Sequence, residues 1–80
     1  MEKIKVGVIF GGQSTEHDVS VVSGSSVIKN LNKEKYEIYP IYISKDGEWF
    51  HYMKPVQDIE IFEIGEQPKE LEKISNEYET

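Results

Sequence analysis

The first hydrophobic segment spans residues 3–10 and is apolar at nearly every position. In an extended chain one side carries Ile4, Val6, Val8 and Phe10, and the other carries Lys5, Gly7 and Ile9. Strands that are apolar on both sides are typical of parallel sheets, which are covered on both faces. The pattern therefore predicts a strand buried on both faces, which ends at the glycine pair of residues 11–12.

After the glycines the apolar spacing changes to that of a helix. We expect Thr15 to cap the first turn, with Asp18 three residues later in a capping-box pattern. Apolar and small residues then form one stripe at helical spacing: Val21, Gly24, Ile28 and Leu31. The many small side chains would let this helix lie close to a sheet. We expect it to end within residues 30–33.

A second strand is predicted at residues 36–43, which are rich in Ile and Tyr. Pro40 lacks the N–H group that a sheet ladder uses, so we expect this strand at a sheet edge. Strand, helix and strand form a βαβ unit with a right-handed crossover. Asp46-Gly47 predicts a hairpin turn, after which residues 48–52 return as an antiparallel strand.

The pattern weakens in the C-terminal third of the chain. Residues 53–66 fit no single element, and Val56 with residues 59–64 suits a short extended piece. Pro68 is expected to open a last helix, with Leu71, Ile74 and Tyr78 on one side. The predicted fold is therefore α/β: one βαβ unit, a β-hairpin and a C-terminal helix. Because one good helix cannot cover both faces of the first strand, we expect these residues to begin a larger domain.

Charge and composition exclude several classes of function. Residues 1–57 carry seven acids and seven lysines, whereas residues 58–80 carry eight acids and two lysines. An acidic tail without clustered cations argues against nucleic acid as a partner, and we expect that tail to be solvated surface. The chain has no cysteine and no arginine, which excludes disulfides and thiolate metal sites. No apolar run reaches the roughly 20 residues of a membrane span, so we expect a cytoplasmic protein.

The segment that carries chemistry is the turn at residues 11–20, between the end of a strand and the start of a helix. In open α/β sheets ligands bind at this place, and free amides at a helix start attract anions. The turn is neither G-x-G-x-x-G nor a phosphate-binding loop with its lysine. On these grounds alone, a tight turn capped by Thr15 is the favoured interpretation.

The string V-I-F-G-G-x-S-x-E-H-D-V-S at residues 8–20 closely resembles the N-terminal motif of the D-alanine–D-alanine ligases. The helix after it, the Y-E-I-Y-P-I-Y-I strand and the S-K-D-G-E-W hairpin are also similar to that family. The resemblance covers residues 4–52 well and is vague beyond them. D-alanine–D-lactate and D-alanine–D-serine ligases share the motif, so the second substrate stays open.

The resemblance implies an ATP-grasp ligase, of which residues 1–80 are the N-terminal part of the Rossmann-like preATP-grasp domain. In that family ATP phosphorylates one D-alanine, and the amino group of a second D-alanine attacks the acyl phosphate. The product serves peptidoglycan synthesis. The resemblance further implies ATP and Mg²⁺ (or Mn²⁺) bound by domains absent here, and a homodimer of the full-length protein. The 80 residues alone are expected to be inactive.

Site residues follow from the same resemblance. The position of Glu16 matches the family's acid that holds the ammonium group of the first D-alanine, and Val19 matches a residue beside its methyl group. Ser20 is assigned to the same pocket, and its hydroxyl is also expected to bond the loop. The turn itself is assigned to Gly11, Gly12 and Ser14.

The two histidines give a weaker signal. His17 is expected to be a surface residue at the helix start. His17, Asp18 and His51 do not have the spacing of a metal site, so no metal is expected in this chain. An alternative hypothesis from another functional class is that the protein is a binding module without catalysis, which binds its ligand at the same strand-to-helix turn. The discriminating observation is whether an ATP-grasp sequence follows Thr80.

Overall fold

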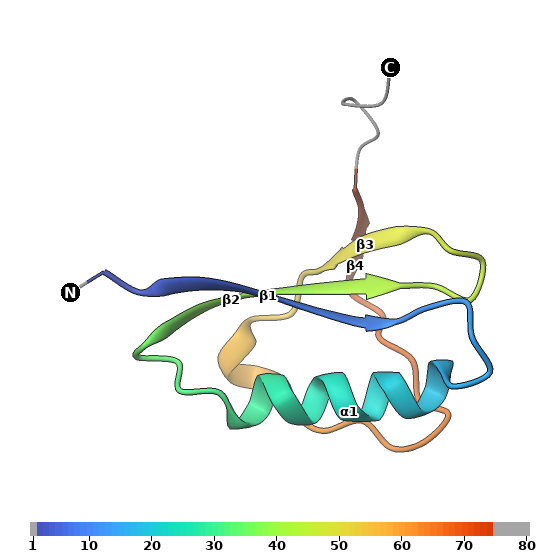
Figure 1. Ribbon diagram of the computed structural model, residues 1–80, viewed down its shortest axis with the longest axis horizontal. Coiled ribbons are helices and arrows are strands. Elements are labelled where there is room, and N and C mark those ends of the chain that lie inside the picture. Colours follow the sequence, from blue (N-terminus) through green and yellow to red (C-terminus); the bar gives the residue numbers. More distant parts are fainter. Residues whose placement is uncertain (1, 75–80) are drawn as a thin grey trace.

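The computed structural model describes residues 2–74 of the 80-residue chain. Its elements are β1 (Ile4–Gly11), α1 (His17–Asn30), β2 (Tyr36–Ile43), β3 (Trp49–Tyr52), the 3-10 turn η1 (Val56–Asp58) and β4 (Leu71–Lys73). The strands form one sheet in the order β1-β2-β3-β4, with α1 on one side of it (Figure 1). The expected α/β fold, with its βαβ unit and hairpin, is confirmed.

Strand pairing changes direction across the sheet. β1 and β2 are parallel over eight residue pairs, whereas β3 runs antiparallel to both β2 and β4. The expected edge position of β2 is wrong, because β2 lies between β1 and β3. Pro40 is tolerated there because the ladder to β3 starts only at Ile41, one residue beyond the proline.

The core lies between α1 and the inner face of the sheet. Val21 and Ile28 of α1 are fully buried, and Phe10 of β1 is 2% exposed. Gly24 lies between them in sequence, and a Cβ atom there would come within 2.3 Å of the Phe10 Cβ. The predicted apolar stripe is confirmed, and the small residue at its centre lets α1 approach β1 closely.

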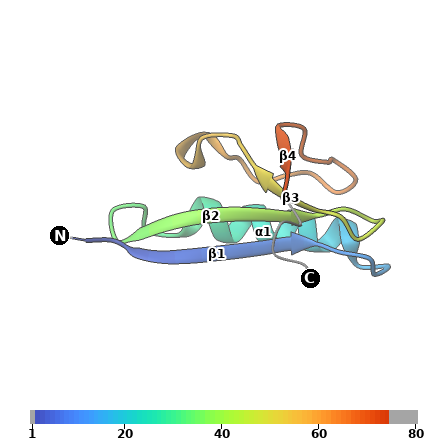
Figure 2. The same ribbon diagram turned by 90° about the horizontal axis from the view of Figure 1, so that it is seen from above.

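The outer face of the sheet is uncovered among the described residues. Figure 2 looks onto this face, with α1 behind the strands. Ile9 is 55% exposed and Tyr39 is 41% exposed. The expected burial of the first strand on both faces is therefore wrong within residues 2–74, because α1 covers only the side of Val8 and Phe10.

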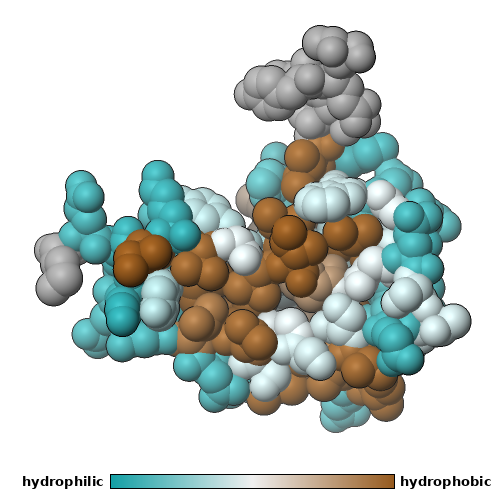
Figure 3. All heavy atoms as spheres, viewed as in Figure 1, coloured by the Kyte–Doolittle hydropathy of each residue, from teal (hydrophilic) through white to brown (hydrophobic). Residues whose placement is uncertain are grey.

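Large apolar side chains of β1 and α1 are also exposed. In the view of Figure 3, hydrophobic residues form a band across the middle of the molecule. Four large apolar residues of these two elements are exposed: Ile4, Ile9, Val19 and Val27. The free edge of β1 belongs to the same region, since β1 is the outermost strand of the sheet.

Residues 59–67, here called the strap, lie along α1 in the opposite direction (Figure 1). Near the end of α1, Lys29 pairs with Glu60 at 2.6 Å, and near its middle the Phe62 N–H donates to Ser25 Oγ at 2.9 Å. Ile59 is only 2% exposed and joins the core. The expectation of a wholly solvated acidic tail is thus wrong: Ile59 is buried and Phe62 packs against the core, whereas the acids of the strap and Ile64 face water.

The predicted C-terminal helix is also wrong. Residues 71–73 form β4, in which Leu71 pairs with Tyr52 and Lys73 pairs with Phe50. The edge of β3 offers unpaired backbone groups that a strand satisfies and a helix does not. Tyr78, the third residue of the predicted stripe, lies outside the described residues.

Candidate functional site

The turn between β1 and α1 needs glycine at its first two positions. Gly11 and Gly12 have φ angles of 92° and 107°, a region that residues with a side chain rarely adopt. A Cβ atom on Gly11 would also lie 2.3 Å from the carbonyl oxygen of Ile43. The glycine pair therefore lets the chain leave β1 sharply while it stays against the end of β2.

Four backbone amides of the turn donate to partners within the chain. The Gly11 N–H donates to Ser20 Oγ at 3.0 Å, and the Gly12 N–H donates to the Ile43 carbonyl at 2.8 Å. The Glu16 N–H donates to Ser14 Oγ at 3.0 Å, and the His17 N–H donates to the Ser14 carbonyl at 3.1 Å. These bonds define one conformation of the turn, and the expected loop bond of Ser20 is confirmed.

The helix starts one residue later than expected. Glu16 occupies the N-cap position, and its side chain makes no capping hydrogen bond. Ser14, not Thr15, supplies the hydroxyl that accepts an amide at the helix start. The predicted Thr15 cap is therefore wrong, because the side-chain hydroxyl that accepts an amide in this turn belongs to Ser14.

The residues matched to the substrate pocket are exposed at this turn. Glu16 is exposed and follows the tight turn directly, and Val19 is 50% exposed on the first turn of α1. Ser20 is half-buried because its hydroxyl faces the backbone of Gly11. Glu16, Val19 and the glycine turn thus lie together at the carboxyl end of β1, where α/β proteins bind ligands.

His17 is buried, contrary to the expected surface position. The residue is 2% exposed, and its Nδ1 lies 2.7 Å from the carbonyl oxygen of Gly12. Its Nε2 lies 3.0 Å from the Tyr42 hydroxyl and 3.0 Å from Gln67 Oε1. A sequence signal for this burial exists, because His17 extends the stripe of Val21 and Gly24 by one helical turn.

Tyr42 and Gln67 complete this buried group of polar side chains. The Tyr42 hydroxyl donates to Gln67 Oε1 at 3.0 Å, and Gln67 Nε2 donates to Asp18 Oδ1 at 2.9 Å. Burial, and then the charge of Asp18, raise the pKa of the Tyr42 phenol. Asp18 also lies 3.8 Å from Lys45 Nζ of the hairpin. No pattern in the sequence pointed to Gln67, which comes from the strap.

The histidines do not form a metal centre. His17 is buried at the start of α1, whereas His51 is exposed on β3. Within residues 2–74, no three His, Cys, Asp or Glu side chains are grouped as ligands of one ion.

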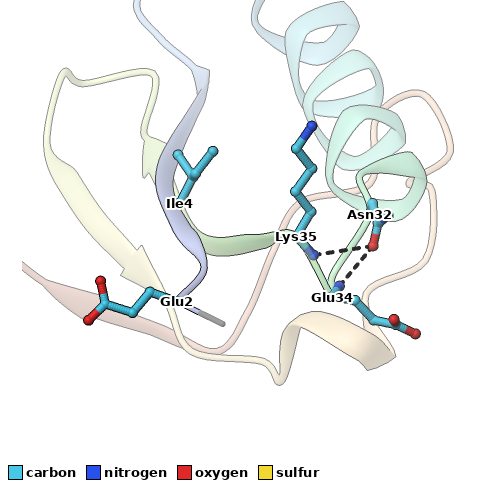
Figure 4. Close-up of a pocket in the computed structure, with 5 residues that line it drawn as sticks. All are labelled: Glu2, Ile4, Asn32, Glu34 and Lys35. Atoms are coloured by element: carbon cyan, nitrogen blue, oxygen red, sulfur yellow. Dashed lines mark hydrogen bonds between the residues drawn. The ribbon is translucent and has the colours of Figure 1, made fainter.

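A separate hollow lies at the other end of β1, away from the glycine turn. It holds about 460 Å³ and is lined by Glu2, Ile4, Asn32, Glu34 and Lys35 (Figure 4). Asn32 Oδ1 accepts the backbone amides of Glu34 and Lys35 at 2.9 and 3.3 Å, as the dashed lines in Figure 4 show. Asn32 thus stabilises the connection from α1 to β2. Its presence beside the hollow is therefore explained by the structure of this connection.

Comparison with known proteins identifies relatives over most of the chain. The family described as D-ala D-ala ligase N-terminus matches residues 5–79. The D-alanine--D-alanine ligase of Clostridium novyi is 59% identical over 58 residues, which are 72% of this chain and 17% of the relative. That of Thermoanaerobacter sp. is 54% identical over 70 residues, which are 88% of this chain and 19% of the relative.

Solved structures show the same fold. The VanG D-Ala:D-Ser ligase of Enterococcus faecalis superposes with a TM-score of 0.65 at 46% identity, over 72% of this chain and 17% of that one. The D-alanine-D-alanine ligase of Coxiella burnetii gives 0.64 at 38% identity, over 69% of this chain and 16% of that one. This chain spans less than a fifth of the length of these relatives.

Within the described residues, no helix has the length and apolar character that crossing a membrane requires. Both the family match and the shared fold show that the chain belongs to the family of D-alanine–D-alanine ligase N-terminal domains.

Proposed function

We propose that residues 1–80 supply part of the pocket for the first D-alanine in an ATP-dependent D-alanine–D-alanine ligase. The observation that carries the proposal is the position of Glu16, an exposed carboxylate directly after the glycine turn, in a chain of this family. An ionised carboxylate forms a strong, charge-assisted hydrogen bond with an ammonium group. Glu16 would thereby orient the amino group of the substrate, and orientation lowers the barrier to reaction.

Val19 and Ser20 complete the proposed contribution of this chain. Val19 lies three residues after Glu16 on α1 and exposes an apolar surface suited to the methyl group of D-alanine. Ser20 fixes Gly11 through the bond to its amide, and this bond holds the glycine turn against the start of the helix. A bond from Ser20 to the substrate would have to be made in addition to that loop bond.

The residues present do not fit the phosphates of a nucleotide. The amides of Gly11, Gly12, Glu16 and His17 already donate within the chain, and the sequence has no arginine. We therefore assign ATP and Mg²⁺ (or Mn²⁺) to the ATP-grasp part of the full-length protein, outside these residues. On the same reasoning, the 80-residue chain alone is inactive.

The wider context is proposed from the family alone. The full-length ligase would act in the cytoplasm as a homodimer and supply dipeptide for peptidoglycan synthesis. A D-alanine–D-serine or D-alanine–D-lactate ligase is the alternative within the family, and the likeness to the VanG D-Ala:D-Ser ligase keeps it open. Product analysis of the full-length enzyme with each second substrate distinguishes them.

The test of the proposal is Glu16→Gln in the full-length ligase, with D-alanine varied at saturating ATP. Glutamine keeps the size of the side chain and removes the charge. A hydrogen bond to a charged group contributes about 1.5–3 kcal/mol, so kcat/KM for the first D-alanine should fall roughly tenfold to a hundredfold. ATP binding should be nearly unchanged.

The matched control is Glu34→Gln, which removes one exposed carboxylate at the far end of β1. Its kinetics should equal those of the parent enzyme. If Glu16→Gln also leaves the kinetics unchanged and only lowers the melting temperature slightly, Glu16 is a helix-start residue and the proposed substrate contact is wrong.

A further inference from the structure

His17 connects three parts of the chain that are distant in sequence. Its ring contacts the glycine turn through Gly12, the sheet through Tyr42 and the strap through Gln67. The side chain is 2% exposed, yet both ring nitrogens have partners within 3.0 Å. Buried polar groups in proteins are generally hydrogen-bonded, and the ring of His17 follows this rule.

The partners fix the role of one ring nitrogen. A backbone carbonyl only accepts hydrogen bonds, so Nδ1 must carry a proton and donate to Gly12. At 2.7 Å this is the shortest contact that the ring makes. On the other side, Gln67 donates its amide to Asp18, which turns its oxygen toward Tyr42 and His17.

The bond from Nδ1 to Gly12 closes the loop that carries Glu16. The loop follows β1, is bonded to the end of β2 through the Gly12 N–H and the Ile43 carbonyl, and ends at the start of α1. Between these points the bonds of Ser14 are local, to Glu16 and His17. The His17 side chain therefore ties the start of the loop to its end, one residue after Glu16.

We propose that His17 is a positioning residue, whose Nδ1–H holds the loop of residues 12–16 in the conformation that presents Glu16 to D-alanine. This inference rests on the proposed role of Glu16. On the other side the Tyr42 ring packs edge-on against the imidazole and Gln67 lies beside Nε2, and this packing keeps Nδ1 directed at Gly12. His17 itself does not touch the substrate.

Two amide substitutions separate the two sides of the ring. The side-chain nitrogen of asparagine lies near the position of Nδ1, whereas that of glutamine reaches the position of Nε2. In the full-length ligase, His17→Asn should keep the bond to Gly12 and His17→Gln should lose it. Both variants lose the packing of the ring, so both should lose thermal stability to a similar extent.

The readouts are hydrogen exchange of the amides of residues 12–16 and the KM for the first D-alanine. In His17→Gln we expect exchange to become about twofold to tenfold faster and the KM to rise by a similar factor, the value of one ordinary hydrogen bond. In His17→Asn both quantities should stay within about twofold of the parent protein. Tyr42→Phe keeps the Gly12 bond and should resemble His17→Asn.

Exchange that is unchanged in His17→Gln would overturn the inference, whatever the kinetics of Glu16→Gln. A KM that rises equally in His17→Gln and His17→Asn would also overturn it, because the loss would then follow stability. If Glu16→Gln and His17→Gln both leave the KM unchanged, the proposed role of Glu16 fails, and with it the link from His17 to the substrate. Hydrogen exchange of residues 12–16 that is faster in His17→Gln but not in His17→Asn would still support the conclusion that the Nδ1–H bond of His17 fixes the conformation of the loop.

Discussion

Gly24→Ala is the substitution whose effect on stability follows most directly from the structure. The added Cβ would lie 2.3 Å from Cβ and 2.8 Å from Cγ of Phe10, whereas carbon atoms in contact prefer about 3.5–4.0 Å. The Phe10 Cβ is bonded directly to the backbone of β1, so a change of rotamer does not relieve the overlap. α1 would have to retreat from β1 by about 1 Å, which loosens the packing of Val21 and Ile28.

Two opposing contributions determine how much Gly24→Ala lowers the free energy of unfolding. Overpacking costs about 1–3 kcal/mol, and we expect the upper end because neither Cβ can move alone. Alanine recovers about 1 kcal/mol of helix propensity relative to glycine. The net loss is about 2 kcal/mol, which lowers the melting temperature of a domain of this size by roughly 8–16 °C.

The assay is thermal unfolding of the 80-residue chain, followed by circular dichroism. Ser23→Ala is the matched control, because Ser23 is the exposed neighbour of Gly24 on the same helix. This control should melt at or slightly above the temperature of the parent chain. A Gly24→Ala chain that melts at or above the parent temperature would refute the close approach of α1 to β1.

Two further predictions concern the strap and Tyr42. Ile59→Ala should destabilise the chain by about 2–5 kcal/mol because Ile59 is 2% exposed, whereas Ile64→Ala, at a position 68% exposed, should cost far less in urea unfolding. Equal losses would contradict the docking of the strap. The pKa of Tyr42 is raised by burial and by Asp18, so the stabilisation is complete below about pH 10 and is lost as the pH rises through the folded-state pKa. Tyr42→Phe should therefore unfold at higher pH than the parent chain, as followed by phenolate absorbance together with circular dichroism; an unchanged alkaline transition would count against this role of Tyr42.

The features predicted correctly from the sequence depend on neighbours along the chain. The Asp46-Gly47 turn, the stripe of Val21 and Ile28 and the loop bond of Ser20 each lie within a short stretch of consecutive residues or follow a simple period. Local propensity and spacing describe such features well. The substrate roles of Glu16, Val19 and Ser20 stay predictions.

The features that the sequence did not reveal depend on contacts between distant segments. His17 continues the helical stripe in the sequence, but the residues that its buried ring contacts, Tyr42 and Gln67, lie 25 and 50 residues away. β4 forms because β3 has an open edge, which outweighs the weak helical pattern around Leu71. Pro40 fits inside the sheet because the neighbouring ladder begins one residue later. None of these conditions is visible in a window of consecutive residues.

The strap sets a limit on how sequences of this family can be recombined. The region that resembles the ligase family ends with the hairpin at residue 52, which makes that position an attractive crossover point for chimeric ligases. A crossover there would join α1 of one parent to the strap of another, and would separate Ser25 from Phe62 and Asp18 from Gln67. A crossover after residue 73 keeps helix, strap and β4 from one parent, so it preserves every contact that the strap makes with α1.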